Sequence, residues 1–129
     1  MHFAIHITAA PQHDNALRAW RYTEACLSAG HKVVRVFFSG AAVAHGNGLI
    51  TPGRDETGLT QRWQSLAQAH DIELIICVAA ALRHGVLDAD NAKRWEQNSH
   101  NLAQGFSISG LGQLADAMLQ ADRYLCFPD

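Results

Sequence analysis

The amino-acid sequence predicts a single α/β domain, residues 1–129, built as a three-layer α/β/α sandwich on a mainly parallel five-stranded sheet. Short apolar runs typical of strands alternate with segments of helical periodicity along the whole chain. The run at residues 74–78 is apolar on consecutive positions, as in a strand that is covered on both faces, and the run at residues 33–38 is nearly so. A length of 129 residues suits one domain.

The first three elements follow from periodicity. Alternating residues predict a strand at 2–8. Apolar residues at helical spacing predict a helix at 14–29, which Asp14 or Asn15 can cap. A nearly continuous apolar run predicts a second strand at 32–38.

A long connection, residues 39–57, follows the second strand and is rich in Gly, Asn and Pro. Loops of this length in compact domains are usually functional. We therefore expect a lid or a partner-binding segment at the carboxyl edge of the sheet, and a flexible loop without a function stays the alternative. The next helix, residues 59–70, should carry an inward stripe of Leu59, Trp63, Leu66 and Ala67.

The second half of the chain begins with a third strand, residues 73–78, that passes directly into a short helix. We expect the remaining elements in this order: helical pieces at 79–84, 89–95 and 98–103, a strand at 106–109, a helix at 111–120 and a last strand at 123–127. The helix at 111–120 should turn five apolar residues inward: Leu111, Leu114, Ala115, Met118 and Leu119.

The charge of the chain restricts its partners. Charged residues make up 17% of the sequence, against about 25% in typical domains. This shortage indicates a surface that faces another subunit, although a monomer with an uncharged polar surface stays an alternative. The net charge is −2 with no basic run, which disfavours direct tight binding of tRNA or DNA.

The sequence predicts neither a membrane segment nor a cofactor. No apolar run approaches about 20 residues and no signal peptide opens the chain, so we expect a cytoplasmic protein. No glycine-rich phosphate loop is present, although a flavodoxin-like nucleotide binder stays an alternative. His2 and His6 share a strand face but lie about 13 Å apart, so no metal site is expected.

Three cysteines lie at wide, irregular spacings and should be free thiols. Cys26 falls on the first helix and is expected to be a packing residue. Cys126 lies in the last strand, where we expect a packing or subunit-contact role.

Cys77 lies where the third strand becomes a helix. In open α/β sheets, ligands bind at this carboxyl edge. A free thiol is mostly protonated at pH 7, and a helix N-terminus stabilises an anion by about 0.3–1 kcal/mol. We therefore predict that Cys77 is a nucleophile whose thiolate or persulfide faces the N–H groups of Val78 and Ala79, with Arg83 adding charge if the helix bends back. An inert, buried cysteine stays the alternative.

Three segments resemble the DsrE/TusD family of sulfur-relay proteins, most of all its TusD branch: Ile76-Cys77-Val78-Ala79-Ala80-Ala81-Leu82-Arg83-His84-Gly85-Val86, Asn101-Leu102-Ala103-Gln104-Gly105-Phe106 and Ser109-Gly110-Leu111-Gly112. The resemblance spans essentially the whole chain. It implies that Cys77 and Arg83 are the family's functional cysteine and arginine. Members often have a second arginine where this chain has His84.

The resemblance implies a sulfurtransferase without a cofactor. Cys77 would take sulfane sulfur as a persulfide from a TusA-like donor and pass it to a TusE-like acceptor, for 2-thiouridine formation at the tRNA wobble position. TusB-like and TusC-like subunits would complete a heterohexamer. Two alternatives stay open: a DsrE-type carrier in dissimilatory sulfur oxidation, and a non-catalytic assembly subunit.

Overall fold

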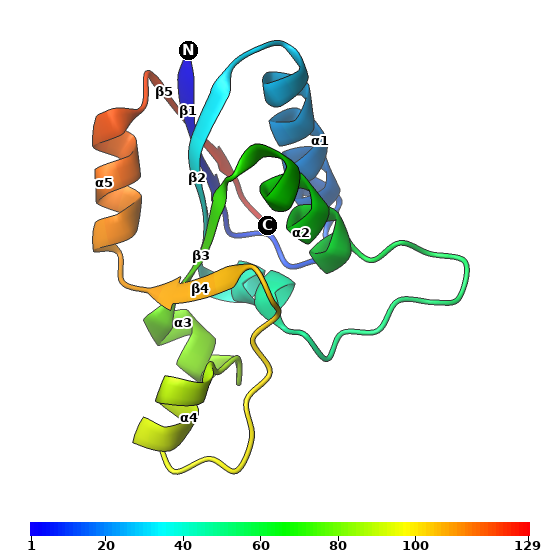
Figure 1. Cartoon of the computed structure of the whole chain (residues 1–129), viewed down its shortest axis with the longest axis vertical. Helices are drawn as coiled ribbons and strands as arrows, with labels where there is room; N and C mark the ends of the chain where they lie inside the picture. Colours follow the sequence, from blue (N-terminus) through cyan, green and yellow to red (C-terminus); the bar gives the residue numbers. More distant parts are fainter.

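The computed structural model describes residues 1–129 as one five-stranded sheet with helices on both faces (Figure 1). In chain order the elements are β1 (His2–Ile7), α1 (Asp14–Ser28), β2 (Lys32–Phe38), the 3₁₀ helix η1 (Gly40–Gly46), α2 (Leu59–His70), β3 (Glu73–Cys77), α3 (Val78–Arg83), α4 (Ala89–Arg94), β4 (Phe106–Ser109), α5 (Gly112–Gln120) and β5 (Arg123–Phe127). The strand order is β4-β3-β2-β1-β5 and every pair is parallel. The predicted α/β/α sandwich is confirmed, with a sheet that is parallel throughout.

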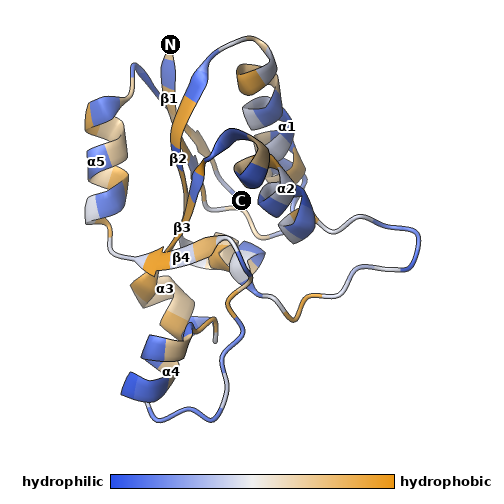
Figure 2. Cartoon of the chain, in the orientation of Figure 1, coloured by the Kyte–Doolittle hydropathy of each residue, from blue (hydrophilic) through white to orange (hydrophobic).

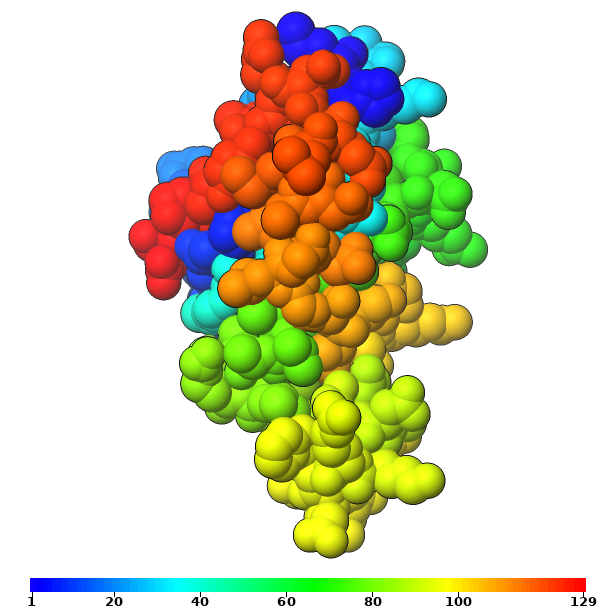
Figure 3. All heavy atoms as spheres, turned by 90° about the vertical axis from the view of Figure 1, so that its left-hand side faces the viewer, coloured from blue at the N-terminus to red at the C-terminus, as the bar shows by residue number.

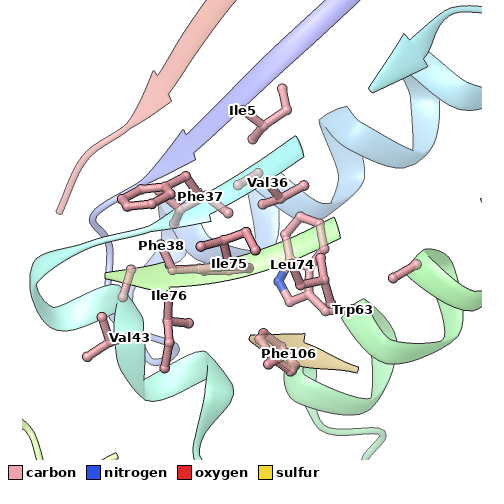
Figure 4. Close-up of a cluster of buried hydrophobic side chains, with 14 of the residues drawn as sticks. Ile5, Val36, Phe37, Phe38, Val43, Trp63, Leu74, Ile75, Ile76 and Phe106 are labelled. Atoms are coloured by element: carbon pink, nitrogen blue, oxygen red, sulfur yellow. The ribbon is translucent and has the colours of Figure 1, made fainter. Parts of the chain in front are cut away.

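The main core lies between the sheet and the layer formed by α1 and α2 (Figure 4). Trp63 of α2 is fully buried, and its ring meets that of Phe38 edge-on at 5.6 Å. Phe106 of β4 packs against Phe38 at the same centroid distance. The inward stripe predicted for α2 is confirmed, with Trp63, Leu66 and Ala67 buried and Leu59 packed against the core.

The opposite face of the sheet is covered by α5 (Figure 3). The buried Arg35 of β2 holds this helix. Its Nη1 donates to the carbonyl oxygen of Gln113 (2.9 Å) and to Asp116 (3.2 Å), and its Nη2 donates to Glu73 of β3 (2.7 Å). Because Arg35 of β2 binds both α5 and Glu73 of β3, it fixes the position of the helix on the sheet.

The predicted inward stripe of α5 is wrong. Leu111 is 62%, Met118 45% and Leu119 88% exposed, and Ala115 is exposed as well. Ala117 is the residue of α5 that is buried, and Leu114 is partly buried against the core. The reason is that α5 contacts the sheet through the side that carries Gln113, Leu114 and Ala117, and no further layer covers its outer side.

The predicted connection at residues 39–57 is only partly a loop. Its first half forms η1, which packs on β3 and α3, and the extended part is confined to residues 47–58 (Figure 1). Residues 98–103 form no helix, because Leu102 pairs with Asn47 in an isolated antiparallel bridge.

Two helix starts differ from the prediction. The N-cap of α1 is His13, whose ring nitrogen accepts from the backbone of Asn15. The helix α5 begins at Gly112 rather than Leu111, without a side-chain cap. No helix in the structure has the length and apolar character that crossing a membrane requires.

Candidate functional site

Cys77 is the last residue of β3 and the N-cap of α3. Its backbone is extended (φ −66°, ψ 125°) and its side chain is 7% exposed. Because β3 lies between β4 and β2, serines flank Cys77 on both sides. Ser109 of β4 is its registered partner, and Ser39 follows the registered pair Phe38–Ile76 by one residue. Cys77 is thus a buried residue at the carboxyl edge of the sheet.

Small residues let the cysteine-bearing helix lie close to the sheet edge. Ala80 and Ala81 of α3 are buried, and Figure 2 shows α3 as hydrophobic beside the largely hydrophilic α4. Gly85 ends the helix with φ 72°, a conformation that glycine adopts without strain. The N–H of Val86 then bonds to the carbonyl of Ala81 (2.9 Å), which closes the turn.

The structure brings three of the four predicted site residues together. Val78 and Ala79 open α3 directly after Cys77, where helical N–H groups lack partners within the helix. Arg83 is the last residue of the same helix, about 9 Å along its axis from Cys77 at 1.5 Å per residue. Arg83 is exposed, and its side chain makes no hydrogen bond or ion pair within the chain. Stabilisation of a sulfur anion by these residues stays a prediction.

A groove of about 770 Å³ begins at the far end of α3. Arg83 is its one arginine, and Leu49 and Trp95 contribute exposed apolar surface (74% and 56%). Cys77 is not among the lining residues. The groove is therefore a neighbour of the cysteine's helix rather than a pocket around the sulfur.

Asn101 ties the segments around this groove together. Its Oδ1 accepts from the backbone of Leu87 (2.9 Å), and its Nδ2 donates to Asn47 Oδ1 (3.1 Å) and to the carbonyl of Gly85 (3.0 Å). The turn after α3, the start of the extended loop and the segment before β4 are thereby held by one side chain. The motif that begins at Asn101 has a structural role.

A hydrogen-bonded relay close to Cys77 was missed by the sequence analysis. Nε2 of His6 lies 2.7 Å from Ser39 Oγ, and its Nδ1 lies 2.7 Å from the hydroxyl of Tyr124. Burial lowers the pKa of His6 below its ordinary value, so its imidazole is neutral at pH 7. The signal available in the sequence was a histidine on the polar side of a central strand, considered only as a metal ligand.

The two other cysteines lie in different surroundings. Cys26 is 6% exposed within the core, which confirms its packing role. Cys126 is exposed on β5 beside His6, so it does not pack in this chain, and a subunit contact stays a prediction. Burial and, to a lesser degree, the neighbouring Cys126 raise the pKa of Tyr124.

These features define a class of protein: a parallel α/β/α domain with a free cysteine at the strand-to-helix junction of its carboxyl edge. Residues 1–127 match the DsrE/DsrF-like family, and the chain belongs to that family.

Known relatives cover most of the chain. A sulfurtransferase TusD homolog of Aliivibrio fischeri is 46% identical over 85% of both chains. A protein of Allochromatium vinosum with the provisional name sulfurtransferase DsrE is 39% identical over the full length of both. The crystal structure of the ychN protein from E. coli has the same fold (TM-score 0.74, 21% identity, 98% of this chain and 100% of that one). A sulfurtransferase role follows from these relationships.

Proposed function

We propose that this sulfurtransferase carries sulfane sulfur as a persulfide on Cys77. The observation that carries the proposal is the position of Cys77, the one cysteine at the carboxyl edge of the sheet that also opens a helix. Cys26 is a core residue and Cys126 lies on an edge strand away from any helix start. Family membership supports a thiol-based transfer at this position.

The chemistry is an exchange between sulfur atoms. The thiolate of Cys77 attacks the outer sulfur of a donor persulfide, a new S–S bond forms, and the donor leaves as a thiolate. The same step in the opposite sense passes the sulfur to an acceptor thiolate. The amides of Val78 and Ala79 stabilise the bound anion, and Arg83 attracts the anionic partner to the end of α3.

The pathway that we favour is tRNA thiolation in the cytoplasm. A TusA-like protein donates the sulfur and a TusE-like protein accepts it, toward 2-thiouridine at the wobble position. The name of the Aliivibrio fischeri relative, a sulfurtransferase TusD homolog, supports this assignment. The net charge of −2 agrees with a subunit that does not itself bind tRNA tightly.

A second candidate is a DsrE-type carrier in sulfur oxidation. The relative from Allochromatium vinosum, which aligns over the full length of this chain, favours it. The cysteine chemistry is the same in both pathways, and the partners and the direction of sulfur flow differ.

Sister subunits are the partners that we assign to the outer side of α5. Leu111, Met118 and Leu119 form an exposed apolar surface there, called the α5 surface below. A patch of this kind on a small domain is characteristic of a protein interface. We propose that TusB-like and TusC-like subunits cover it in a heterohexamer.

The experiment is complementation of tRNA thiolation. In cells that lack their own copy of this protein, the wild type and Cys126→Ser should restore 2-thiouridine in tRNA, and Cys77→Ser should not. Restoration by Cys77→Ser would instead assign the protein as a non-catalytic assembly subunit. Failure of the wild type would favour the sulfur-oxidation role.

A further inference from the structure

The relay formed by Ser39, His6 and Tyr124 crosses three neighbouring strands on one face of the sheet. Ser39 follows β2, His6 lies on β1 and Tyr124 on β5, in the order in which these strands lie side by side. Both hydrogen bonds are short, at 2.7 Å. The ring of His6 also packs edge-on against Phe37 (5.9 Å between centroids), which fixes its orientation.

The inner end of the relay is next to Cys77. Phe37 pairs with Ile75 and Phe38 with Ile76, and Ser39 and Cys77 are the residues that directly follow this last pair. Neighbouring strands lie about 4.8 Å apart, and residues at matching positions share a face. Ser39 and Cys77 therefore point to the side of the sheet that carries His6.

The outer end of the relay reaches solvent. Tyr124 is 41% exposed, while His6 and Ser39 are half-buried. The relay thus connects a buried thiol position to water through three groups that can each donate and accept a proton. Burial of His6 lowers its pKa and keeps the imidazole neutral, which leaves one of its nitrogens free to accept.

We propose that Ser39 and His6 are positioning residues for sulfur on Cys77, and that the Ser39–His6–Tyr124 relay carries the thiol proton to solvent. The inference rests on the proposed role of Cys77. The thiol proton passes to Ser39 Oγ while the hydroxyl proton of Ser39 passes to Nε2 of His6. The proton on Nδ1 passes to Tyr124, whose own proton leaves to water. The thiolate then attacks the donor persulfide, the donor S–S bond breaks, and the donor departs as a thiolate.

The relay also suits the persulfide that results. Ser39 makes no hydrogen bond to the Cys77 thiol in this structure. Rotation about the Cα–Cβ bond of Cys77, or the second sulfur atom of the persulfide, brings sulfur toward the Ser39 hydroxyl. With the relay reversed, Tyr124 donates to His6, His6 to Ser39, and Ser39 to the anionic outer sulfur. Hydrogen bonds to ionised acceptors are the stronger ones.

The structure supplies a matched control for this inference. Ser109 is the registered neighbour of Cys77 on β4, and its hydroxyl makes no hydrogen bond within the chain. Ser39 and Ser109 therefore flank the same sulfur, and only Ser39 belongs to the relay. Apart from the relay itself, the titratable groups on the elements around His6 (β1, β2, β5 and α5) are His2, Lys32, Arg35, Asp116, Arg123 and Cys126.

The test measures alkylation of Cys77 by iodoacetamide from pH 6 to 9 in the full-length protein, with peptide mass spectrometry to separate Cys77 from the other cysteines. We expect Ser39→Ala and His6→Phe to slow the reaction at pH 7 about tenfold, the fold-change of one hydrogen bond to a charged group. The half-maximal rate should move to higher pH. Ser39→Thr should keep the wild-type profile, and Tyr124→Phe should give a smaller shift.

The control decides the interpretation. Ser109→Ala should leave the profile unchanged. Equal profiles for Ser39→Ala and the wild type, or equal shifts for Ser39→Ala and Ser109→Ala, would overturn the relay. Loading of the same samples with glutathione persulfide distinguishes a failure of the persulfide role of Cys77 from a failure of the relay. No sulfur on wild-type Cys77 rejects the persulfide role, whereas equally fast loading of wild type and Ser39→Ala rejects the relay alone.

Discussion

Gly46 packs directly against Ile76, the residue before Cys77. A Cβ at Gly46 would lie 3.3 Å from both Cδ1 and Cγ2 of Ile76, which is tighter than ordinary contact. The last residue of η1 is thus in close contact with the carboxyl end of β3.

Gly46→Ala should therefore destabilise the protein by about 1–3 kcal/mol, the usual cost of overpacking a close contact. Urea unfolding measures this loss. Gly110→Ala is the control, because a Cβ there meets nothing within 4 Å. Equal unfolding midpoints for the two variants would show that η1 does not constrain β3.

His45 should make the stability depend on pH. It is fully buried, its Nε2 lies 3.1 Å from the carbonyl oxygen of Ala9, and burial lowers its pKa to about 4. The unfolded chain binds this proton below about pH 6.5. Stability is thus complete above that pH and is lost as the pH falls toward 4, by about 3 kcal/mol in all.

The measurement is the free energy of unfolding at pH 7 and pH 4.5 for the wild type and His45→Phe. The phenylalanine keeps the ring that packs on Phe38 (5.2 Å) but cannot be protonated. Between pH 7 and pH 4.5, the free energy of unfolding of His45→Phe should fall by less than that of the wild type. The difference between the two falls should be about 2–3 kcal/mol. An identical fall in both proteins would contradict the assignment to His45.

Arg35 should anchor α5 to the sheet. In Arg35→Met, α5 loses the hydrogen bonds that Arg35 donates to Gln113 and Asp116, and β3 loses the one that Arg35 donates to Glu73. Because the side chains of Glu73 and Asp116 are more than half exposed, water solvates the released carboxylates, and we expect a loss of about 1–2 kcal/mol. Urea unfolding of Arg35→Met is compared with the exposed-site control Arg123→Met, and a loss no larger than that of the control would refute the anchor.

The α5 surface should matter for assembly and not for folding. Leu119 is 88% exposed, so Leu119→Glu should change the stability of the isolated chain by less than about 0.5 kcal/mol. Co-purification with TusB-like and TusC-like subunits should be lost, because a charge is placed in an apolar contact. Gln104→Glu adds the same charge elsewhere and should assemble normally. Normal assembly of Leu119→Glu would place the interface on another surface.

Much of the fold follows from local patterns. Each strand is a short run of apolar or alternating residues, and each was predicted within one or two residues of its observed bounds. The position of Cys77 at the end of β3 was also predicted, because alanines and a leucine replace the β-branched residues there.

Two features depend on information that local patterns do not contain. The apolar side of α5 was predicted, but periodicity cannot say whether the chain itself covers it, and here it faces outward. The relay requires the strand order β2-β1-β5, which brings together three residues far apart in the sequence. The sequence alone therefore does not indicate which residues contact His6.

The most direct test of the central claim is the site at which sulfur is bound. The full-length protein is incubated with glutathione persulfide, alkylated and mapped by mass spectrometry. Wild type and Cys126→Ser should each gain about 32 Da on the peptide that contains Cys77, and Cys77→Ser should gain nothing. Sulfur that persists in Cys77→Ser, or that appears on Cys126 instead, would contradict the account.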